Sequence, residues 1–159
     1  MERQKLTALI VDNDFETAKK LTNILYKTVP LEAVLYASNY SEAARVLLHR
    51  YISLVLIEVA LPGRNGIELL RILRDSNYGA EVIMVSENSN NYYRELCSSL
   101  GASYYFDKSD DMEKIAFIAS ELCSDIKKTT PYRHIPRSIS SEVSRMHVNS
   151  INLNDNLYQ

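Results

Sequence analysis

The feature that most constrains the fold is a series of five short apolar runs, each followed by polar residues and then by a segment of helical periodicity. The runs cover residues 6–11, 31–36, 54–57, 81–85 and 103–106. Short apolar runs rich in β-branched residues are typical of strands buried on both faces of a parallel sheet. Because parallel strands need right-handed crossovers, the segments between the runs predict helices on both faces of the sheet. The sequence therefore predicts a doubly wound α/β fold.

The size and composition fit one domain with an extension. The chain has 159 residues, of which 46 % are hydrophobic and 24 % charged, and its net charge is -2. This balance gives no overall basic field that would attract nucleic acid. The first apolar run, near the N-terminus, is too short for a signal peptide. No segment approaches about 18 consecutive apolar residues, the length needed for a transmembrane helix. We therefore expect a soluble, cytoplasmic protein without membrane contact.

Several residues are predicted to mark helix ends. Asp14 is placed to cap the helix after the first run, and Asn39 or Ser41 can cap the next helix, by accepting from free backbone N–H groups. Gly79 is expected to end the third helix as a C-terminal cap. Asp110 or Asp111 is expected to cap the last helix.

The two cysteines and the three histidines predict no chemistry of their own. Cys97 and Cys123 form no C-x-x-C pattern, and no cluster of metal-ligating residues accompanies them in the sequence. Both are expected to pack as small apolar side chains on helices.

Polar residues follow the predicted strands at the same end of each. Asp12 and Asn13 follow the first run, Glu58 closes the third, Ser86 follows the fourth, and Lys108 comes after the fifth. The carboxyl ends of parallel strands share one edge of the sheet, where open α/β folds bind ligands. We expect these side chains to form one site.

The residues around the third run carry a resemblance to a known family. The run ends at Glu58, the turn Leu61-Pro62-Gly63 follows, and the pair Gly101-Ala102 precedes the fifth run. Over residues 6–126 the sequence resembles the receiver domains of two-component response regulators. The resemblance implies a flavodoxin-like (βα)5 fold with strand order 2-1-3-4-5 and a signalling role that is not enzymatic. Where the family has its phospho-accepting aspartate, this chain has Glu58.

The resemblance also assigns roles to single residues. In a receiver, two acids and the acceptor hold Mg²⁺ with a backbone carbonyl, while a hydroxyl and a lysine bind the phosphoryl oxygens. Carried over to this chain, the positions are Asp12 (first acid), Asn13 (second acid), Glu58 (acceptor), Ala60 (carbonyl), Ser86 (switch hydroxyl), Tyr105 (switch aromatic) and Lys108 (lysine).

Two departures weaken the chemistry that the resemblance implies. Asn13 replaces a charged ligand of a hard cation by a neutral amide, and Glu58 moves its carboxylate outward by one methylene. We expect Mg²⁺ to bind weakly or not at all, with Asp12, Asn13, Glu58 and the Ala60 carbonyl as its ligands at most. Ser109 replaces the proline that usually follows the lysine and is expected to loosen that loop.

The sequence therefore predicts an atypical receiver that works by protein contact, independently of phosphorylation. Glu58 could pair with Lys108 or accept from the Ser86 hydroxyl, which would imitate the phosphorylated form. The expected surface is formed by the fourth helix, the fifth strand and the fifth helix, which the family commonly uses for pairing. The expected partner is another protein or a second copy of the chain, with no direct binding of nucleic acid, because no helix-turn-helix motif follows the domain.

Two alternatives stay open at the level of sequence. A receiver could retain residual phosphoryl transfer to Glu58. Alternatively, Asp12 and Asp14, with Ser86, Lys108 and the pair Asp110-Asp111, loosely resemble the motifs of haloacid-dehalogenase-type phosphatases, in which Asp12 would be the nucleophile and Asp14 the general acid.

The end of the chain differs from the rest in composition. Residues 1–127 are predicted to form the receiver-like domain, and residues 128–159 are poor in large apolar side chains and rich in asparagine towards the terminus. Ile139, Val143 and Met146 could share one face of a short helix. The sequence predicts a C-terminal extension that is flexible or docks on a partner.

Overall fold

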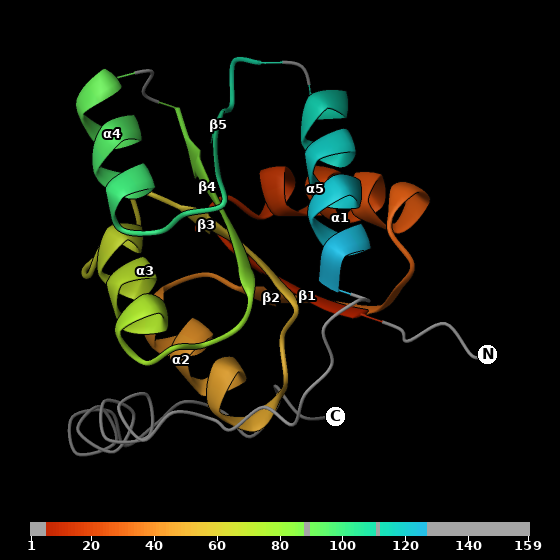
Figure 1. Ribbon diagram of the computed structural model, residues 1–159, viewed down its shortest axis with the longest axis horizontal. Coiled ribbons are helices and arrows are strands. Elements are labelled where there is room, and N and C mark those ends of the chain that lie inside the picture. Colours follow the sequence, from red (N-terminus) through yellow and green to blue (C-terminus); the bar gives the residue numbers. More distant parts are fainter. Residues whose placement is uncertain (1–5, 88–89, 111, 127–159) are drawn as a thin grey trace.

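The computed structural model describes residues 6–87, 90–110 and 112–126, in which strands and helices alternate from β1 to α5 (Figure 1). The strands are β1 (Leu6–Val11), β2 (Leu31–Ala37), β3 (Leu54–Glu58), β4 (Glu81–Ser86) and β5 (Tyr104–Asp107). The helices are α1 (Phe15–Thr28), α2 (Tyr40–His49), α3 (Gly66–Asp75), α4 (Asn91–Ser99) and α5 (Met112–Ile126). Each strand begins and ends within one residue of its predicted bounds.

The strands form one parallel sheet in the order β2-β1-β3-β4-β5, which confirms the predicted flavodoxin-like topology. Helices α1 and α5 cover one face, and α2, α3 and α4 cover the other (Figure 1). None of the helices in the described ranges is long and apolar enough to cross a membrane.

The central strands are buried on both faces, as their continuous apolar runs predict. Every residue of β1 and β3 is buried. Leu9 and Val11 pack in the core under α2, α3 and α4, whereas Ala8 and Ile10 pack under α1 and α5. Burying one such aliphatic side chain stabilises a fold by roughly 1.5–3 kcal/mol, so this strand pair anchors the loops that follow it.

The register of the sheet brings the polar strand ends together. Val11 pairs with Ile57, and Glu58 pairs with Val85, so Asp12 and Glu58 leave neighbouring strands at the same level. On the other side of β4, Ser86 pairs with Asp107, one residue before Lys108.

The helix starts confirm two of the predicted caps. The Asp14 carboxylate accepts from the backbone N–H groups of Glu16 and Thr17 at the start of α1. Of the two candidates for α2, Asn39 is the cap, and its side chain accepts from the backbone N–H of Glu42 at 2.9 Å. The predicted cap at Asp111 and the extension at residues 128–159 lie outside the described residues.

The prediction that Gly79 ends α3 is wrong. The helix ends at Asp75, and Asn77 adopts the left-handed conformation with φ of 54°. The backbone N–H of Asn77 donates to the Arg74 carbonyl, and that of Tyr78 to the Leu73 carbonyl, which together form a Schellman motif. Asparagine tolerates this conformation better than other residues with a side chain, so it ends the helix before the glycine is reached.

Candidate functional site

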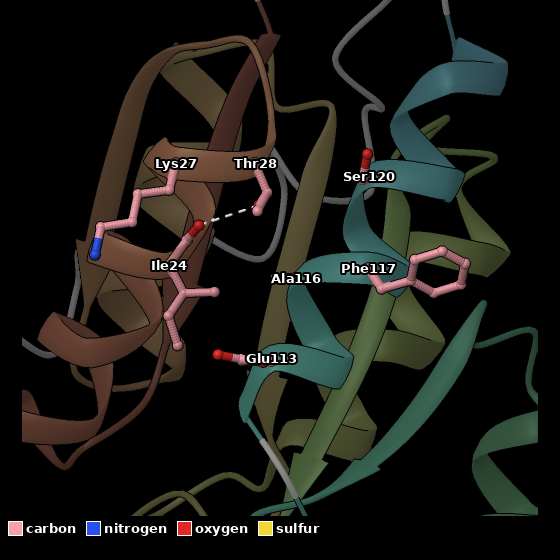
Figure 2. A pocket seen from close by; sticks show the side chains of 7 residues that line it. All are labelled: Ile24, Lys27, Thr28, Glu113, Ala116, Phe117 and Ser120. Atoms are coloured by element: carbon pink, nitrogen blue, oxygen red, sulfur yellow. Dashed lines mark hydrogen bonds between the residues drawn. The ribbon is translucent and has the colours of Figure 1, made fainter.

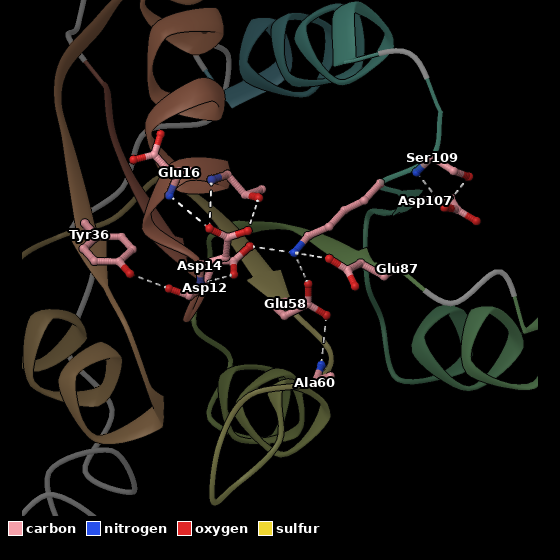
Figure 3. A network of polar contacts seen from close by, with 11 residues as sticks. Asp12, Asp14, Glu16, Tyr36, Glu58, Ala60, Glu87, Asp107 and Ser109 are labelled. Carbon is pink, nitrogen blue, oxygen red and sulfur yellow. Dashed lines mark hydrogen bonds and ion pairs between the residues drawn. The ribbon is translucent and has the colours of Figure 1, made fainter.

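At the carboxyl edge of the sheet, Lys108 lies between two carboxylates. Its Nζ atom is 2.5 Å from Glu58 Oε2 and 3.0 Å from Asp12 Oδ2. Figure 3 marks these contacts of Glu58 and Asp12 with dashed lines. The exposed fraction of the side chain is 2 % for Asp12, 5 % for Glu58 and 10 % for Lys108. Three residues at the ends of three different strands therefore form one buried charge cluster.

The cluster holds two negative charges and one positive charge. Burial by itself lowers the pKa of Lys108, but the contacts with Glu58 and Asp12 outweigh burial and raise the pKa above its ordinary value of 10.5. Lys108 is therefore cationic at neutral pH. Glu87 also faces the cluster, with its Oε1 atom 4.0 Å from Lys108 Nζ, but its side chain is 78 % exposed, so the solvent screens this contact.

The remaining oxygens of the two buried carboxylates accept hydrogen bonds from the backbone of their own loops. Asp12 Oδ1 accepts from the N–H of Asp14 at 2.8 Å, and Glu58 Oε1 accepts from the N–H of Ala60 at 3.0 Å (Figure 3). Both carboxylates are thereby fixed in orientation, with one oxygen held by the backbone and the other facing Lys108.

The residues present do not fit the Mg²⁺ site that the receiver resemblance implies. A small divalent cation needs several oxygen ligands that point at one place. Here the Lys108 ammonium lies where a cation would contact Asp12 and Glu58, and every oxygen of these two carboxylates is already engaged. Asn13, the third position, is exposed and uncharged. Among the described residues, no group of three acidic, histidine or cysteine side chains is arranged to hold a metal.

Ser86 and Tyr105, for which the receiver resemblance predicts switch roles, lie side by side on β4 and β5. Both are buried. Burial raises the pKa of the Tyr105 hydroxyl, and a hydrogen bond with the Ser86 side chain partly offsets this rise. The guanidinium of Arg94 on α4 lies 4.9 Å from the centre of the Tyr105 ring. A chain of contacts thus runs from the end of β4 through β5 to the surface of α4.

The loop that carries Lys108 is held by hydrogen bonds of Ser109, the residue that is expected to loosen it relative to proline. Asp107 Oδ1 accepts from the Ser109 backbone N–H at 2.9 Å and from the Ser109 hydroxyl at 2.7 Å. These bonds lower the pKa of Asp107. The backbone N–H of Lys108 donates to the Ser86 carbonyl at 2.8 Å. A proline at position 109 could make neither of the Ser109 bonds, because it lacks both the N–H and the hydroxyl.

Two supporting residues were not identified from the sequence. The Tyr36 hydroxyl donates to the Asp12 carbonyl at 2.7 Å and fixes the loop after β1 (Figure 3). Gly66 lies so close to β3 that a Cβ atom there would be 2.1 Å from the Glu58 carbonyl oxygen. The turn signal around Gly66 is visible in the sequence, whereas the close approach to Glu58 depends on the tertiary fold.

The fold and the arrangement of the strand ends define a signalling domain of one family. The sequence model of the response regulator receiver domain matches residues 8–119. The chain belongs to the response regulator receiver domain family.

Among curated proteins, the chain is similar to two regulators of Escherichia coli K12. It is 27 % identical to the DNA-binding transcriptional activator EvgA over 110 residues, which cover 69 % of this chain and 53 % of EvgA. It is 33 % identical to the transcriptional regulatory protein CpxR over 116 residues, which cover 72 % of this chain and 48 % of CpxR. The chain therefore spans about half the length of these relatives.

Solved receiver structures share the fold at low sequence identity. The receiver domain of the Francisella response regulator 1452 has a TM-score of 0.70 at 20 % identity, covering 77 % of this chain and all of that domain. The receiver domain of an HD domain-containing protein from Pseudomonas fluorescens Pf-5 has a TM-score of 0.72 at 17 % identity, covering 79 % of this chain and all of that domain.

Proposed function

We propose that this receiver acts through protein contacts without phosphorylation, and that the Glu58 carboxylate takes the part of the phosphoryl group. The chain would then be a signalling module without enzymatic activity. The observation that carries the proposal is the contact of Glu58 Oε2 with Lys108 Nζ at 2.5 Å. Lys108 occupies the position that the family uses to bind phosphoryl oxygens, and here its charge is already neutralised by a side chain of the protein.

The geometry around Glu58 also disfavours chemistry at this carboxylate. A phosphoryl acceptor must present a free oxygen to the donor, and the reaction depends on positioning and charge stabilisation. Glu58 Oε1 is held by the Ala60 N–H and Oε2 by Lys108, while the buried acids keep a net negative charge that repels an anionic donor. Residual phosphoryl transfer to Glu58 is the second candidate, supported by the retention of Asp12 and Lys108.

The phosphatase alternative loses its basis with membership in the receiver family. Its general acid would be Asp14, but this carboxylate is engaged as the cap of α1, where it also accepts from the Thr17 hydroxyl at 2.8 Å.

The proposed contact surface is the face of α4, β5 and α5. Tyr92 on α4 is 64 % exposed, and its ring meets that of Tyr93 edge to face with 5.6 Å between centroids. Exposed aromatic side chains on a polar surface are common anchors of protein interfaces. Arg94, next to this pair, contacts the Tyr105 ring. A rearrangement of the side chains at the strand ends could therefore shift Arg94 and alter the surface of α4. The partner would be another protein or a second copy, and no nucleic acid contact is proposed.

Incubation of the purified chain with acetyl phosphate and Mg²⁺, followed by intact mass measurement, tests the independence from phosphorylation. We expect no added phosphoryl group on the natural chain. The matched control is the double variant Asn13→Asp with Glu58→Asp, which shortens the acceptor and restores the third charge. This variant should bind Mg²⁺ in a titration and gain a phosphoryl group. Phosphorylation of the natural chain would overturn this part of the proposal.

The part played by the Glu58 charge is tested separately by NMR. In Glu58→Gln, amide resonances of Tyr105 and of α4 should move, because the neutral amide holds Lys108 less tightly. Glu68→Gln is the control, since Glu68 makes a solvent-exposed ion pair with Arg64 on α3. If the two variants leave α4 equally undisturbed, the Glu58 charge has no role in setting the surface.

A further inference from the structure

A pocket of about 500 Å³ opens between α1 and α5, on the face of the sheet opposite α4 (Figure 2). Its apolar lining comes from Ile24 on α1 and from Ala116 and Phe117 on α5, and charged groups stand at its rim on both helices. The Phe117 side chain is 64 % exposed. The Phe117 ring points from α5 away from Ile24 (Figure 2), so an exposed aromatic side chain adjoins the pocket on the side opposite α1, which indicates a surface that can accept an apolar segment.

Acidic residues frame Phe117 along α5. Glu113 and Glu121 stand one helical turn before and after Phe117, Asp125 stands one turn further on, and all four residues are exposed. Residues four apart share one side of a helix. We call the three acidic residues, Glu113, Glu121 and Asp125, the acidic stripe. A segment that fits it needs apolar side chains for the pocket and basic side chains for the carboxylates.

The chain itself carries a candidate segment in the residues that follow α5. In residues 127–159, basic residues exceed acidic ones by three, whereas in residues 1–126 acidic residues exceed basic ones by five. Ile139, Val143 and Met146 recur at spacings of four and three, which places them on one face of a helix, with Arg137 and Arg145 nearby in the sequence. Residues 139–146 thus have the apolar pattern, with Glu142 and Arg145 as their charged residues, and the basic excess of the tail comes from residues that flank them, including Arg137.

The length of chain after α5 allows this segment to reach the pocket. From Ile126 back to Phe117 the distance along the helix is about 14 Å. Residues 127–138 can span up to roughly 40 Å when extended. Pro131 and Pro136 disfavour a continuation of the α5 helix through this linker, so the chain can turn back.

We propose that residues 139–146 dock on the pocket between α1 and α5 of the same chain, with their apolar face over Ile24 and Phe117, and with Arg145 and the flanking Arg137 against the acidic stripe. A second copy is a less suitable occupant, because a symmetric contact across α5 would bring acidic stripe against acidic stripe. The proposed docking does not depend on the part assigned to Glu58.

Cross-linking within the full-length chain tests the proposal. The test variant combines Ser120→Cys at the pocket with Ser144→Cys in the segment, and a short bismaleimide joins the two thiols. The control combines Ser98→Cys on α4 with the same Ser144→Cys. The native Cys97 and Cys123 are both buried, so they should react slowly. A flexible tail has an effective concentration in the millimolar range near any site that it can reach, so docking should raise the test rate on the order of tenfold above the control.

Point changes then identify the contacts. Phe117→Ser and Val143→Asp, each added to the test pair, should lower the rate to that of the control, and Glu121→Lys should lower it in part. Phe117 is exposed, so its replacement leaves the core intact. Equal rates for the test and control pairs would overturn the proposal. Cross-links that join two chains, and that increase with protein concentration, would instead identify a second copy as the occupant and would also overturn it.

Discussion

The cluster of Asp12, Glu58 and Lys108 has two negative charges and one positive charge, and this imbalance determines how the protein's stability responds to substitution. Two buried carboxylates face one ammonium, so removal of one carboxylate leaves a balanced pair. Removal of the ammonium leaves two like charges without a counterion. A buried charge that loses its partner destabilises a fold much more than the intact pair stabilises it.

Lys108→Met should therefore destabilise the protein by about 3 kcal/mol, because Asp12 and Glu58 then repel each other in a buried site. Glu58→Gln should change the free energy of unfolding by only about 1 kcal/mol, since Asp12 still pairs with Lys108. Urea denaturation at neutral pH measures both values.

The pH dependence provides the control for this pair of variants. The folded-state pKa of Lys108 lies above 10.5, so its contacts stabilise the fold fully below that pH and are lost as pH rises through the folded-state value. Lys108→Met lacks this alkaline loss. Equal destabilisation by the two variants would show that the three charges do not act as one cluster.

At the scale of the elements, the start of α3 determines where the Glu58 loop lies. Gly66 opens the helix, and its N–H donates to the Val59 carbonyl at 3.0 Å. Its Cα lies against the end of β3, where a Cβ would meet the Glu58 carbonyl oxygen and Ile57 Cγ2. The helix can approach the strand so closely only because the residue is glycine.

Gly66→Ala should destabilise the protein by about 2–3 kcal/mol, because the added methyl group would push the start of α3 away from the Glu58 backbone at the end of β3. Gly63→Ala is the matched control in the same loop. Gly63 has φ of 78° but nothing within 4 Å of its Cβ position, so only backbone strain of about 1 kcal/mol is expected. Urea denaturation of the two variants separates the clash from the strain. A smaller loss in Gly66→Ala than in Gly63→Ala would contradict this view of the loop.

At the scale of the whole molecule, the fold follows closely from the sequence. Strands β1 and β3 are buried on both faces, so their apolar runs are continuous and their bounds easy to place. The end of α3 was misplaced because Asn77, rather than Gly79, supplies the left-handed residue. Asparagine tolerates the left-handed conformation less readily than glycine, yet Asn77 adopts it two residues before Gly79.

The candidate site was predictable as a set of residues but only in part as a set of contacts. Parallel topology brings Asp12, Glu58 and Lys108 to one edge, which is a consequence of strand order. The Tyr36 hydroxyl bond to Asp12 joins residues that are 24 positions apart and lie on different strands, and no sequence pattern encodes its direction. The bonds of Ser109 to Asp107 were not predicted, because they depend on the shape of a single turn.

A buried tyrosine, Tyr78, makes the free energy of unfolding depend on pH in the alkaline range. Burial raises the pKa of Tyr78 from 10.0 to about 12, although a hydrogen bond from the Ile52 N–H partly opposes the rise. Because the folded-state pKa is the higher one, stability should fall by on the order of 2 kcal/mol as pH rises from 10 to 12.

Tyr78→Phe should be less stable than the natural protein at pH 8, because the Ile52 N–H loses its acceptor. Between pH 10 and pH 12 the difference should shrink, since phenylalanine does not titrate. Thermal unfolding monitored by circular dichroism over this range measures the change. A constant difference would mean that Tyr78 ionises freely in the folded protein.

The contact between Glu58 and Lys108 has a consequence for timing. A phosphoryl group on a receiver is removed by hydrolysis after a limited time, so the signal of a phosphorylated receiver ends without any loss of protein. A glutamate lasts as long as the polypeptide does. Under the proposed function, the duration of the signal is therefore the half-life of the chain, and its strength is the number of copies present. Synthesis and degradation, rather than a kinase and its opposing phosphatase, would then start and stop the output.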